Sequence, residues 1–222
     1  QSYIRMILKK GKVLNKKWRW NVSKYELEEL EDLLKVSDQN EEVLKGIDLT
    51  LNRGKVIALL GRNGAGKTTS TQLLLHQYEP TTGSIELDGH AIHEYDQRAF
   101  LSQFGVIQQD PVILFGFSVR DNVLLGVDRK VADEELCEVF KELLIDDFFQ
   151  KLPKKLDTLV GEETNFSGGQ EQLIAVARVF LQKRNFMIFD EGMSQMDIEK
   201  ENRVVNLFKK EAKRAGVLFI TH

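Results

Sequence analysis

Residues 61–69, GRNGAGKTT, combine three glycines with a lysine and two threonines. Glycines let backbone N–H groups turn inward around an anion, a lysine at this spacing reaches β- and γ-phosphates, and the following threonine ligates Mg²⁺. The apolar run Val56–Leu60 precedes the glycines and predicts a strand buried on both faces, and a helical pattern follows from Thr68. The spacing G-x-x-x-x-G-K-T in this strand–loop–helix context predicts binding of a nucleoside triphosphate with Mg²⁺.

A pair of carboxylates follows a second apolar run. Residues 186–189 predict another buried strand, which ends in Asp190 and Glu191. Ligands of parallel sheets bind beyond the carboxyl ends of the strands, and adjacent strand residues point to opposite sides. We therefore expect Asp190 to hold the Mg²⁺ shell and Glu191 to face a water molecule as general base.

A second helix start that suits an anion lies about a hundred residues after the first. Ser167 is a suitable N-cap, Gly168 and Gly169 allow a ligand to approach the backbone, and a mostly apolar helix is predicted from Gln170. One nucleotide rarely needs two such starts from one chain. A second copy that faces the first would explain both.

Composition and charge exclude some classes of protein. The chain has 222 residues and one cysteine, Cys137. Its net charge of −3 argues against a protein that coats nucleic acid, which would usually carry an excess of basic residues. No apolar run approaches the roughly 20 residues of a membrane helix. Residues 1–20 hold seven basic residues and no acid, whereas residues 26–42 hold eight acids and one lysine. The acidic stretch is most simply a solvated helix face, and the basic stretch is either a solvated face or a contact with anionic headgroups.

From about residue 21 to the end, the chain resembles the nucleotide-binding domain of an ABC transporter. GRNGAGKT resembles the Walker A loop, FMIFDE the Walker B strand, and FSGGQ the signature, with Phe166 in place of leucine. VIQQDPVILF resembles the Q-loop, SQMD the D-loop and LFITH the switch strand. The resemblance implies an α/β P-loop NTPase core with an antiparallel β subdomain and an α-helical subdomain at about residues 110–172, part of which, VADEELCEVFKELLIDDFFQKL, has helical periodicity.

The family's roles carry over to matching positions. The resemblance implies ATP and Mg²⁺ as cofactors, with Glu191, His222 and Gln109 as catalytic residues and Thr68, Gln109 and Asp190 as metal ligands. Tyr25 is the candidate for stacking on adenine, with Trp18 and Trp20 as rivals. The implied nucleotide contacts are Tyr25, Gly61, Arg62, Asn63, Gly64, Ala65, Gly66, Lys67, Thr68, Thr69, Ser167, Gly168, Gly169, Gln170 and Asp197.

The stretch LPKKLDTLVGEETNFSGGQ resembles the exporter branch of the family, in which a glutamate, here Glu162, contacts the membrane domain. Residues 1–20 then resemble a linker from a last membrane helix, so we expect the domain to occupy residues 21–222 on the cytoplasmic face of a membrane. The family continues past its switch histidine, so we expect this chain to have lost a tail after His222. The implied partners are a second nucleotide-binding domain, the same or different and packed head to tail, and a transmembrane domain, with no nucleic acid.

The resemblance implies an ATPase that powers export by ATP-driven dimerisation. The alternatives are a poorly hydrolysing, regulatory half of a paired transporter, and a soluble ABC ATPase. The chain departs from the family at Thr164, where exporters have glycine, and in its methionines near the D-loop, Met193 and Met196. None of these changes removes a catalytic group, which favours hydrolysis. His76, His90 and His93 lack metal-site spacing, and we expect them on the surface or in loops.

Overall fold

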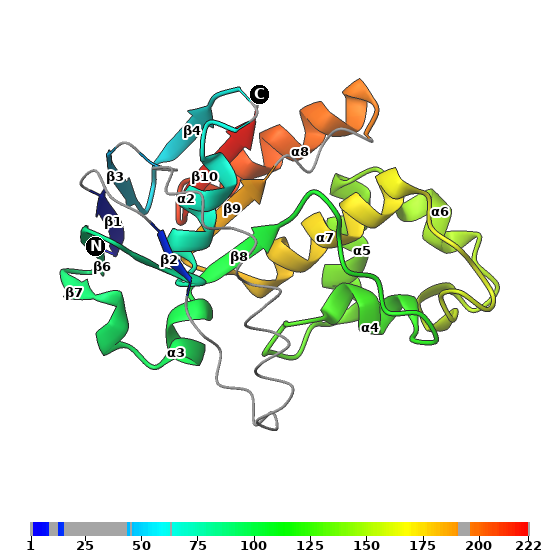
Figure 1. Ribbon diagram of the computed structural model, residues 1–222. Helices are drawn as coiled ribbons and strands as arrows, with labels where there is room; N and C mark the ends of the chain where they lie inside the picture. The colour runs from blue at the N-terminus through cyan, green and yellow to red at the C-terminus, as the bar shows by residue number, and fades with distance from the viewer. Residues whose placement is uncertain are drawn as a thin grey trace, which may run out of the picture. The chain divides into compact units, whose positions relative to one another are not determined.

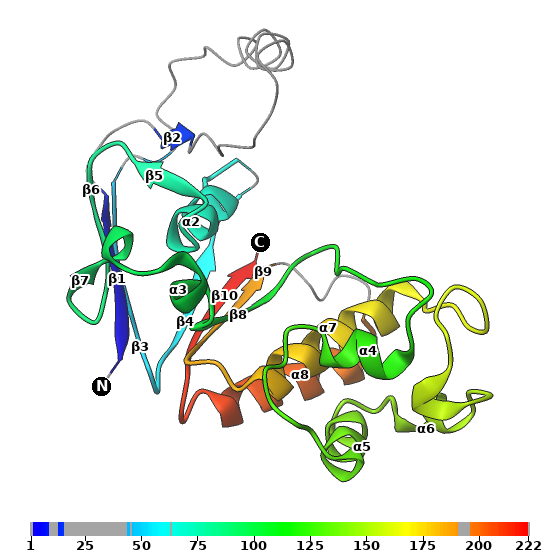
Figure 2. The ribbon, with the colours of Figure 1, turned by 90° about the horizontal axis from the view of Figure 1, so that it is seen from below.

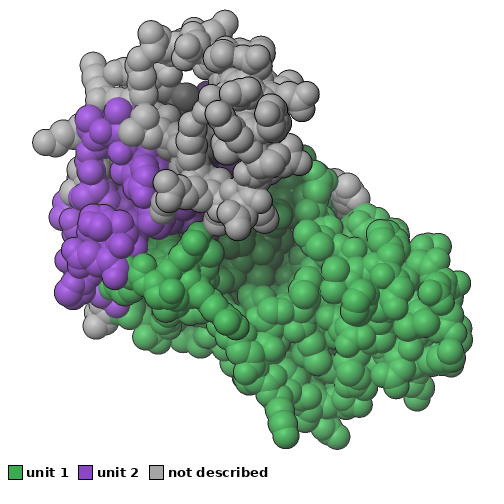
Figure 3. Space-filling model, turned by 60° about the horizontal axis from the view of Figure 1, so that its bottom comes forward, with its two compact units in different colours: residues 1–3, 51–61, 95–222 green, residues 4–50, 62–94 purple. Residues whose placement is uncertain are grey.

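The computed structural model describes residues 2–8, 13–15, 44, 46–62, 64–190 and 196–221 (Figure 1). The chain divides into two compact units, coloured separately in Figure 3. Residues 4–50 and 62–94 form one, called the β unit below, and residues 1–3, 51–61 and 95–222 form the other, called the core unit.

The β unit contains a sheet with the strand order β3-β1-β6-β7, in which β6 pairs antiparallel with both β1 and β7. Its strands are β3 (Ile47–Asn52), β1 (Tyr3–Leu8), β6 (Gly83–Leu87) and β7 (His90–Ala91). Ile4 lies opposite Leu87 and Met6 lies opposite Ile85, and all four side chains are buried. This alternation is what an antiparallel sheet with one covered face requires, and it confirms the predicted antiparallel β part.

Two strands of the β unit lie within residues 1–20, which the sequence analysis assigned to a linker. They are β1 and β2 (Val13–Asn15), and β2 pairs antiparallel with β5 (Tyr78–Pro80). The charge pattern of this stretch is basic throughout, but Ile4 and Met6 alternate with Arg5 and supply a buried strand face. The boundary at residue 21 stays a prediction.

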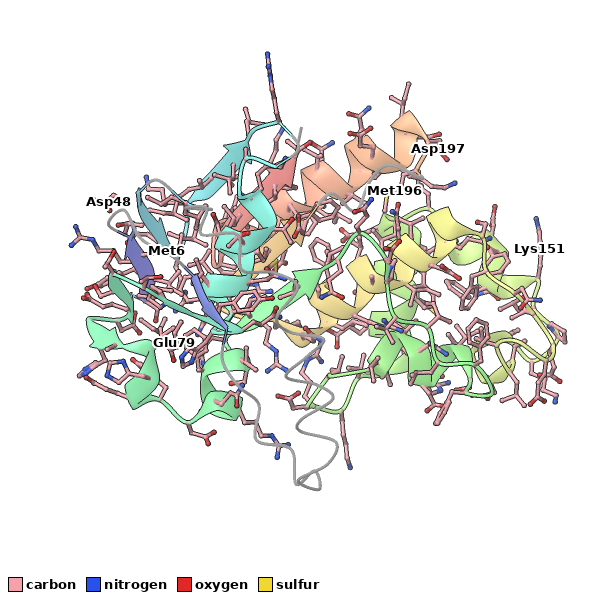
Figure 4. The ribbon with its side chains drawn as sticks, viewed as in Figure 1. Met6, Asp48, Glu79, Lys151, Met196 and Asp197 are labelled. Carbon is pink, nitrogen blue, oxygen red and sulfur yellow. The ribbon has the colours of Figure 1, made fainter. Side chains whose placement is uncertain are left out.

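Helix α2 (Lys67–Leu74) of the β unit ends in a turn that buries a histidine. His76 adopts a positive φ of 55°, and its backbone N–H donates to Leu73 O at 3.0 Å. Its Nε2 lies 2.7 Å from Oε1 of Glu79, which Figure 4 labels. His76 lies in a turn, as the expectation of a surface or loop position allows, but its side chain is buried and not at the surface.

The core unit contains a parallel sheet with the strand order β4-β10-β9-β8. Its strands are β4 (Val56–Leu60), β10 (Gly216–Thr221), β9 (Phe186–Asp190) and β8 (Phe104–Ile107). The predicted strand at 186–189 is confirmed, and its four residues are buried. The prediction that β4 is buried on both faces is wrong: β4 is an edge strand of this sheet, and Val56 and Leu60 are exposed.

Helices of the core unit pack on this sheet through aromatic rings. The rings of Phe180 on α7 (Gly168–Gln182) and Phe208 on α8 (Ile198–Glu211) have centroids 5.1 Å apart. The Phe208 ring also contacts Phe189 of β9 at 5.4 Å and Phe219 of β10 at 5.2 Å. Figures 1 and 2 show α7 and α8 side by side, and this cluster fixes both helices to the two central strands.

The stretch with helical periodicity at 131–152 forms two helices rather than one. The helices are α5 (Asp133–Glu142) and α6 (Asp146–Gln150), and the break is at Leu144, whose φ is 57°. Ile145 N–H donates to Phe140 O at 3.0 Å and Leu144 N–H donates to Lys141 O at 3.1 Å, which is the Schellman pattern of a helix end. The remaining helical elements are α3 (Gln97–Leu101), α4 (Val119–Leu124) and the 3₁₀ turns η2 (Ile92–Glu94) and η3 (Lys155–Asp157).

Candidate functional site

The glycine-rich loop of the β unit leads directly into α2. Gly64 and Gly66 adopt φ of 78° and 86°, a region that side chains with a Cβ rarely adopt. A Cβ added at Gly64 would meet nothing within 4 Å, so glycine is required there by the backbone conformation and not by space. Gly66 is the N-cap of α2, and this helix start has no side-chain cap from the described residues and no acid in its first turn. The N–H groups of such a start suit an anion.

Lys67 lies against this loop. Its side chain is only 7% exposed, and its Nζ donates to Arg62 O at 3.3 Å. Ser70 Oγ donates to Gly66 O at 2.9 Å, which fixes the other side of the loop. A buried ammonium group held against a glycine-rich loop is the arrangement expected of a phosphate site. Of the other predicted loop contacts, Arg62, Gly64, Ala65 and Thr68 are exposed, and Gly61, Gly66 and Thr69 are half-buried.

The four parallel strands of the core unit bring a second set of residues to one edge. Asp190 ends β9, where it is half-exposed and lies beside Ile220 of β10. Gln109 is exposed and follows Ile107, the last residue of β8, by two positions. Thr221 ends β10 beside Leu60 of β4. Because carboxyl ends of parallel strands share an edge, Asp190 and Gln109 belong to the same edge of the core unit.

Four predicted site residues lie outside the described residues: Tyr25, Asn63, Glu191 and His222. Glu191 follows Asp190 directly in the chain, and His222 follows Thr221. Their assignments stay predictions, as do those of Tyr25 and its rivals Trp18 and Trp20.

The start of α7 differs from the start of α2 in being capped. Ser167 Oγ accepts from Gln170 N–H at 3.4 Å, and Gln170 Oε1 accepts from Ser167 N–H at 2.8 Å, which completes a capping box. The hydroxyl proton of Ser167 takes no part in the cap, and Ser167 is exposed. Phe166, which replaces the family's leucine, packs edge-on against Phe148 and Phe149 near α6. The helix start can therefore donate to an external anion without losing its cap.

Asp197 is the N-cap of α8. It accepts from Lys200 N–H at 2.9 Å and from Lys200 Nζ at 2.6 Å, and these bonds hold the pKa of its carboxyl below the ordinary value. Figure 4 shows Asp197 and Met196 at the start of this helix. Within the described chain this arrangement gives Asp197 a capping role, and the predicted nucleotide contact stays a prediction.

Sequence reasoning missed an exposed apolar loop after Gln109. Residues 112–122, which run into the first turn of α4 and are called the apolar loop below, carry Val112, Phe115 and Phe117 at the surface, with Phe115 66% exposed. Gly116 N–H donates to Val160 O at 2.8 Å and Val160 N–H donates to Phe117 O at 2.9 Å. The Phe115 ring covers Gly161, next to Glu162. The signal was an aperiodic apolar run in a predicted loop.

The residues fit Mg²⁺ with few protein ligands. Among the described residues, no group of three or more His, Cys, Asp and Glu side chains could hold a metal ion. Mg²⁺ bound with a nucleotide needs only one or two carboxylates or hydroxyls besides phosphate oxygens and waters. Asp190 of the core unit and Thr68 of the β unit each carry an accessible group of this kind.

Comparison with known proteins defines the class of this protein. The sequence pattern of the family described as "ABC transporter" matches residues 44–194. The chain therefore belongs to the ABC transporter family, and its relatives identify it as a nucleotide-binding domain of exporter type.

Three relatives show the extent of the similarity. The chain is 36% identical to Multidrug resistance protein 1 of Entamoeba histolytica over 82% of the chain and 14% of that protein. It is 37% identical to a putative multidrug export ATP-binding/permease protein of Staphylococcus aureus over 84% of the chain and 32% of that protein. It is 40% identical to Antigen peptide transporter 1 of Rattus norvegicus over 82% of the chain and 25% of that protein.

A solved structure supports the same fold. The structure of a bacterial Atm1-family ABC exporter with ATP bound matches the whole chain with a TM-score of 0.79 and 26% identity, over 34% of that protein. The chain thus spans about a third or less of the length of these relatives. Within the described ranges, no helix combines the length and the apolar character that a membrane span requires.

Proposed function

We propose that this chain is the ATP-binding and ATP-hydrolysing domain of an exporter, and that it works as a dimer on the cytoplasmic face of a membrane. The observation that carries the proposal is the difference between its two anion-ready helix starts. Among the described residues, the start of α2 has no side-chain cap and holds the buried Lys67, whereas the start of α7 is already capped and keeps the Ser167 hydroxyl proton as a donor. The first suits the chain's own nucleotide and the second suits a further phosphate contact.

The proposed chemistry assigns one task to each residue. Lys67 and the backbone N–H groups after Gly66 hold the β- and γ-phosphates. Thr68 and Asp190 hold Mg²⁺, which neutralises charge on the phosphates when it is bound, and Gln109 contacts the metal and the water. Glu191 accepts a proton from that water, and His222 donates to the γ-phosphate. Positioning and charge stabilisation supply most of the rate in this class of reaction.

Dimerisation follows from the second helix start. We propose that Ser167 and Gly169 of one copy donate to the γ-phosphate of ATP held by Lys67 of the other copy. The γ-phosphate can contact both chains only in the dimer, so ATP binding favours the dimer. Hydrolysis removes this contact and lets the two chains separate.

The apolar loop supports a membrane-domain partner. Phe115 and Phe117 are exposed beside Gly161 and Glu162, the stretch that resembles the exporter contact with a membrane domain. A monomeric surface rarely exposes neighbouring aromatic residues without a partner. We propose that this surface docks a helix of the transmembrane domain.

The test is ATP turnover by Glu191→Gln beside binding of a fluorescent ATP analogue. We expect Glu191→Gln to lower the rate by at least about 100-fold, as general bases do, and to bind the analogue like the wild type. Glu138→Gln is the matched control, because Glu138 is an exposed glutamate on α5. If Glu191→Gln turned over ATP at the wild-type rate, Glu191 would not be the general base. If the wild-type chain bound the analogue but did not hydrolyse ATP, the result would favour the alternative of a poorly hydrolysing, regulatory half of a paired transporter.

A further inference from the structure

The middle of α7 buries an arginine whose hydrogen bonds, among the described residues, go to amide groups. Arg178 is 7% exposed. Its Nη1 donates to Val112 O at 2.5 Å, its Nε donates to Asn122 O, and its Nη2 lies 3.3 Å from Asn122 Oδ1. Burial lowers its pKa to about 10, so the guanidinium remains charged at neutral pH. A buried cation in such surroundings is costly unless its donors are satisfied, so these bonds are important to the fold.

The two main-chain acceptors are the two ends of the apolar loop. Val112 begins the loop and Asn122 ends it, on α4. The Asn122 side chain closes the loop from within, because its Nδ2 donates to Leu114 O at 2.9 Å and to Ser118 O at 3.1 Å. Its Oδ1 accepts from Leu114 N–H at 2.8 Å. The loop is therefore internally bonded, and Arg178 attaches both of its ends to α7.

The same helix begins at the signature residues. Ser167 caps α7 eleven positions before Arg178, and α7 is continuous from Gly168 to Gln182. Ten of the fifteen residues of α7 are buried, which resists bending of the helix. A displacement at the start of α7 is thus passed along a continuous helix to the side chain that holds the apolar loop.

We propose that Arg178 is a positioning residue that makes the apolar loop and α7 move as one body, so that nucleotide contact at Ser167 changes the surface formed by Val112, Phe115 and Phe117. This inference rests on the proposed function, which places a nucleotide at Ser167. Arginine suits the task because its planar fork bonds several acceptors in fixed directions, whereas a lysine ammonium on a flexible stem cannot reach both ends of the loop in the same way.

The test is hydrogen exchange, followed by mass spectrometry, with and without a non-hydrolysable ATP analogue and Mg²⁺. In the wild-type chain we expect the analogue to slow exchange in residues 64–69, 167–172 and 112–122, the last by about 5- to 10-fold, a usual size for coupling between sites. In Arg178→Met and Arg178→Lys we expect protection of 64–69 and 167–172 to remain and protection of 112–122 to fall below about twofold.

Arg184→Met is the matched control. Arg184 lies just after α7 and also ties a preceding segment to this helix end, by donating to Asp128 Oδ2 at 2.8 Å and to Gly126 O at 2.9 Å. We expect it to keep the protection of 112–122. Equal protection of 112–122 in Arg178→Met and in the wild type would overturn the inference. Absence of protection at 64–69 in the wild type would instead refute the proposed nucleotide site.

A second measurement needs neither a variant nor a nucleotide. Exchange of the wild-type chain in rising urea reports which amides open together. If the apolar loop and α7 are one body, the amides of Leu114, Gly116 and Val119 merge with those of residues 171–178 into one opening transition. Separate opening of the loop at lower urea would overturn the inference even if Arg178→Met fails to fold.

Discussion

Gln172 is a buried amide whose side chain has no hydrogen-bond partner in the described part of the chain. It is 1% exposed on α7, and neither its Nε2 nor its Oε1 is satisfied. A buried polar group without a partner costs roughly 1–3 kcal/mol, whereas an apolar group of similar shape has no such cost. The residue was unremarkable in the sequence, because a glutamine on a helix is usually solvated.

We therefore expect Gln172→Met to raise the free energy of unfolding by about 1–2 kcal/mol, because methionine has a similar shape and needs no hydrogen bond. Urea unfolding followed by circular dichroism measures this. Gln150→Met is the control, since Gln150 is exposed on α6 and should change stability by less than about 0.5 kcal/mol. A loss of stability in Gln172→Met would show that the amide has a partner in solution.

Ser167 has two roles that a pair of variants can separate. Ser167→Ala removes a cap from α7 and should lower the free energy of unfolding by about 0.5–1 kcal/mol. Asp96→Ala removes the cap of α3, where Asp96 accepts from Ala99 N–H at 2.9 Å, and should lower stability by a similar amount. ATP turnover should fall by about 10- to 100-fold in Ser167→Ala, because the proposed donor to the γ-phosphate is lost, and should be unchanged in Asp96→Ala. Equal turnover in the two variants would show that Ser167 acts only as the cap of α7.

At the level of elements, α5 is tied to the end of α7 by one carboxylate. Glu135 accepts from Arg129 Nη2 at 2.6 Å and lies 2.9 Å from Lys183 Nζ. Hydrogen bonds from Arg129 and then from Lys183 lower the pKa of Glu135 from 4.5 to about 2. The same hydrogen bond raises the pKa of Arg129, so the pair favours the charged form of both partners.

The lowered pKa gives a pH dependence of known sign. The folded protein stabilises the ionised form, so the contribution of Glu135 is complete above its ordinary pKa of 4.5 and is lost as the pH falls toward about 2. We expect Glu135→Gln to be less stable than the wild type at about pH 6, and the difference to shrink as the pH falls to about 3. Urea unfolding at several pH values measures it, with Glu138→Gln as the control on the same helix. A difference that does not change with pH would contradict the ion pair.

Local signals explain which elements could be predicted. The apolar run of β9, the glycine spacing before α2 and the cap at Ser167 each lie within a few residues, so the sequence alone predicts them. The exposure of β4 depends on its edge position in the order β4-β10-β9-β8, which is set by pairing between distant segments. The break at Leu144 was not predictable either, because a leucine with a φ of 57° has no sequence signal.

The residues of the candidate site also differ in whether a local motif or a tertiary contact defines them. The sequence predicts roles for Lys67, Asp190, Gln109 and Ser167, because each stands in a motif with fixed spacing. Arg178 and Asn122 are 56 positions apart and looked like ordinary helix residues until the structure placed their side chains together. Their role depends on a tertiary contact that no spacing encodes.

At the scale of the whole molecule, the proposed head-to-tail dimer makes a quantitative prediction. Lys67→Ala should disable the nucleotide site of its own copy, and Ser167→Arg should disable the site that it completes on the other copy. Each variant alone therefore has two defective sites in every dimer. A mixed dimer has one intact site, formed by Lys67 of the Ser167→Arg copy and Ser167 of the Lys67→Ala copy.

Random mixing at equal amounts makes half of the dimers mixed, so we expect about a quarter of the wild-type turnover from two nearly inactive variants. The measurement is phosphate release at fixed total protein while the ratio of the variants is changed, and the rate should be highest at equal amounts. A mixture that is no more active than its components would show that one chain builds its site alone or that the two sites must be intact together. Mixing Lys67→Ala with the wild-type chain distinguishes these two explanations. Turnover falls below the value expected from dilution of the wild-type chain only if the two sites of a dimer depend on each other.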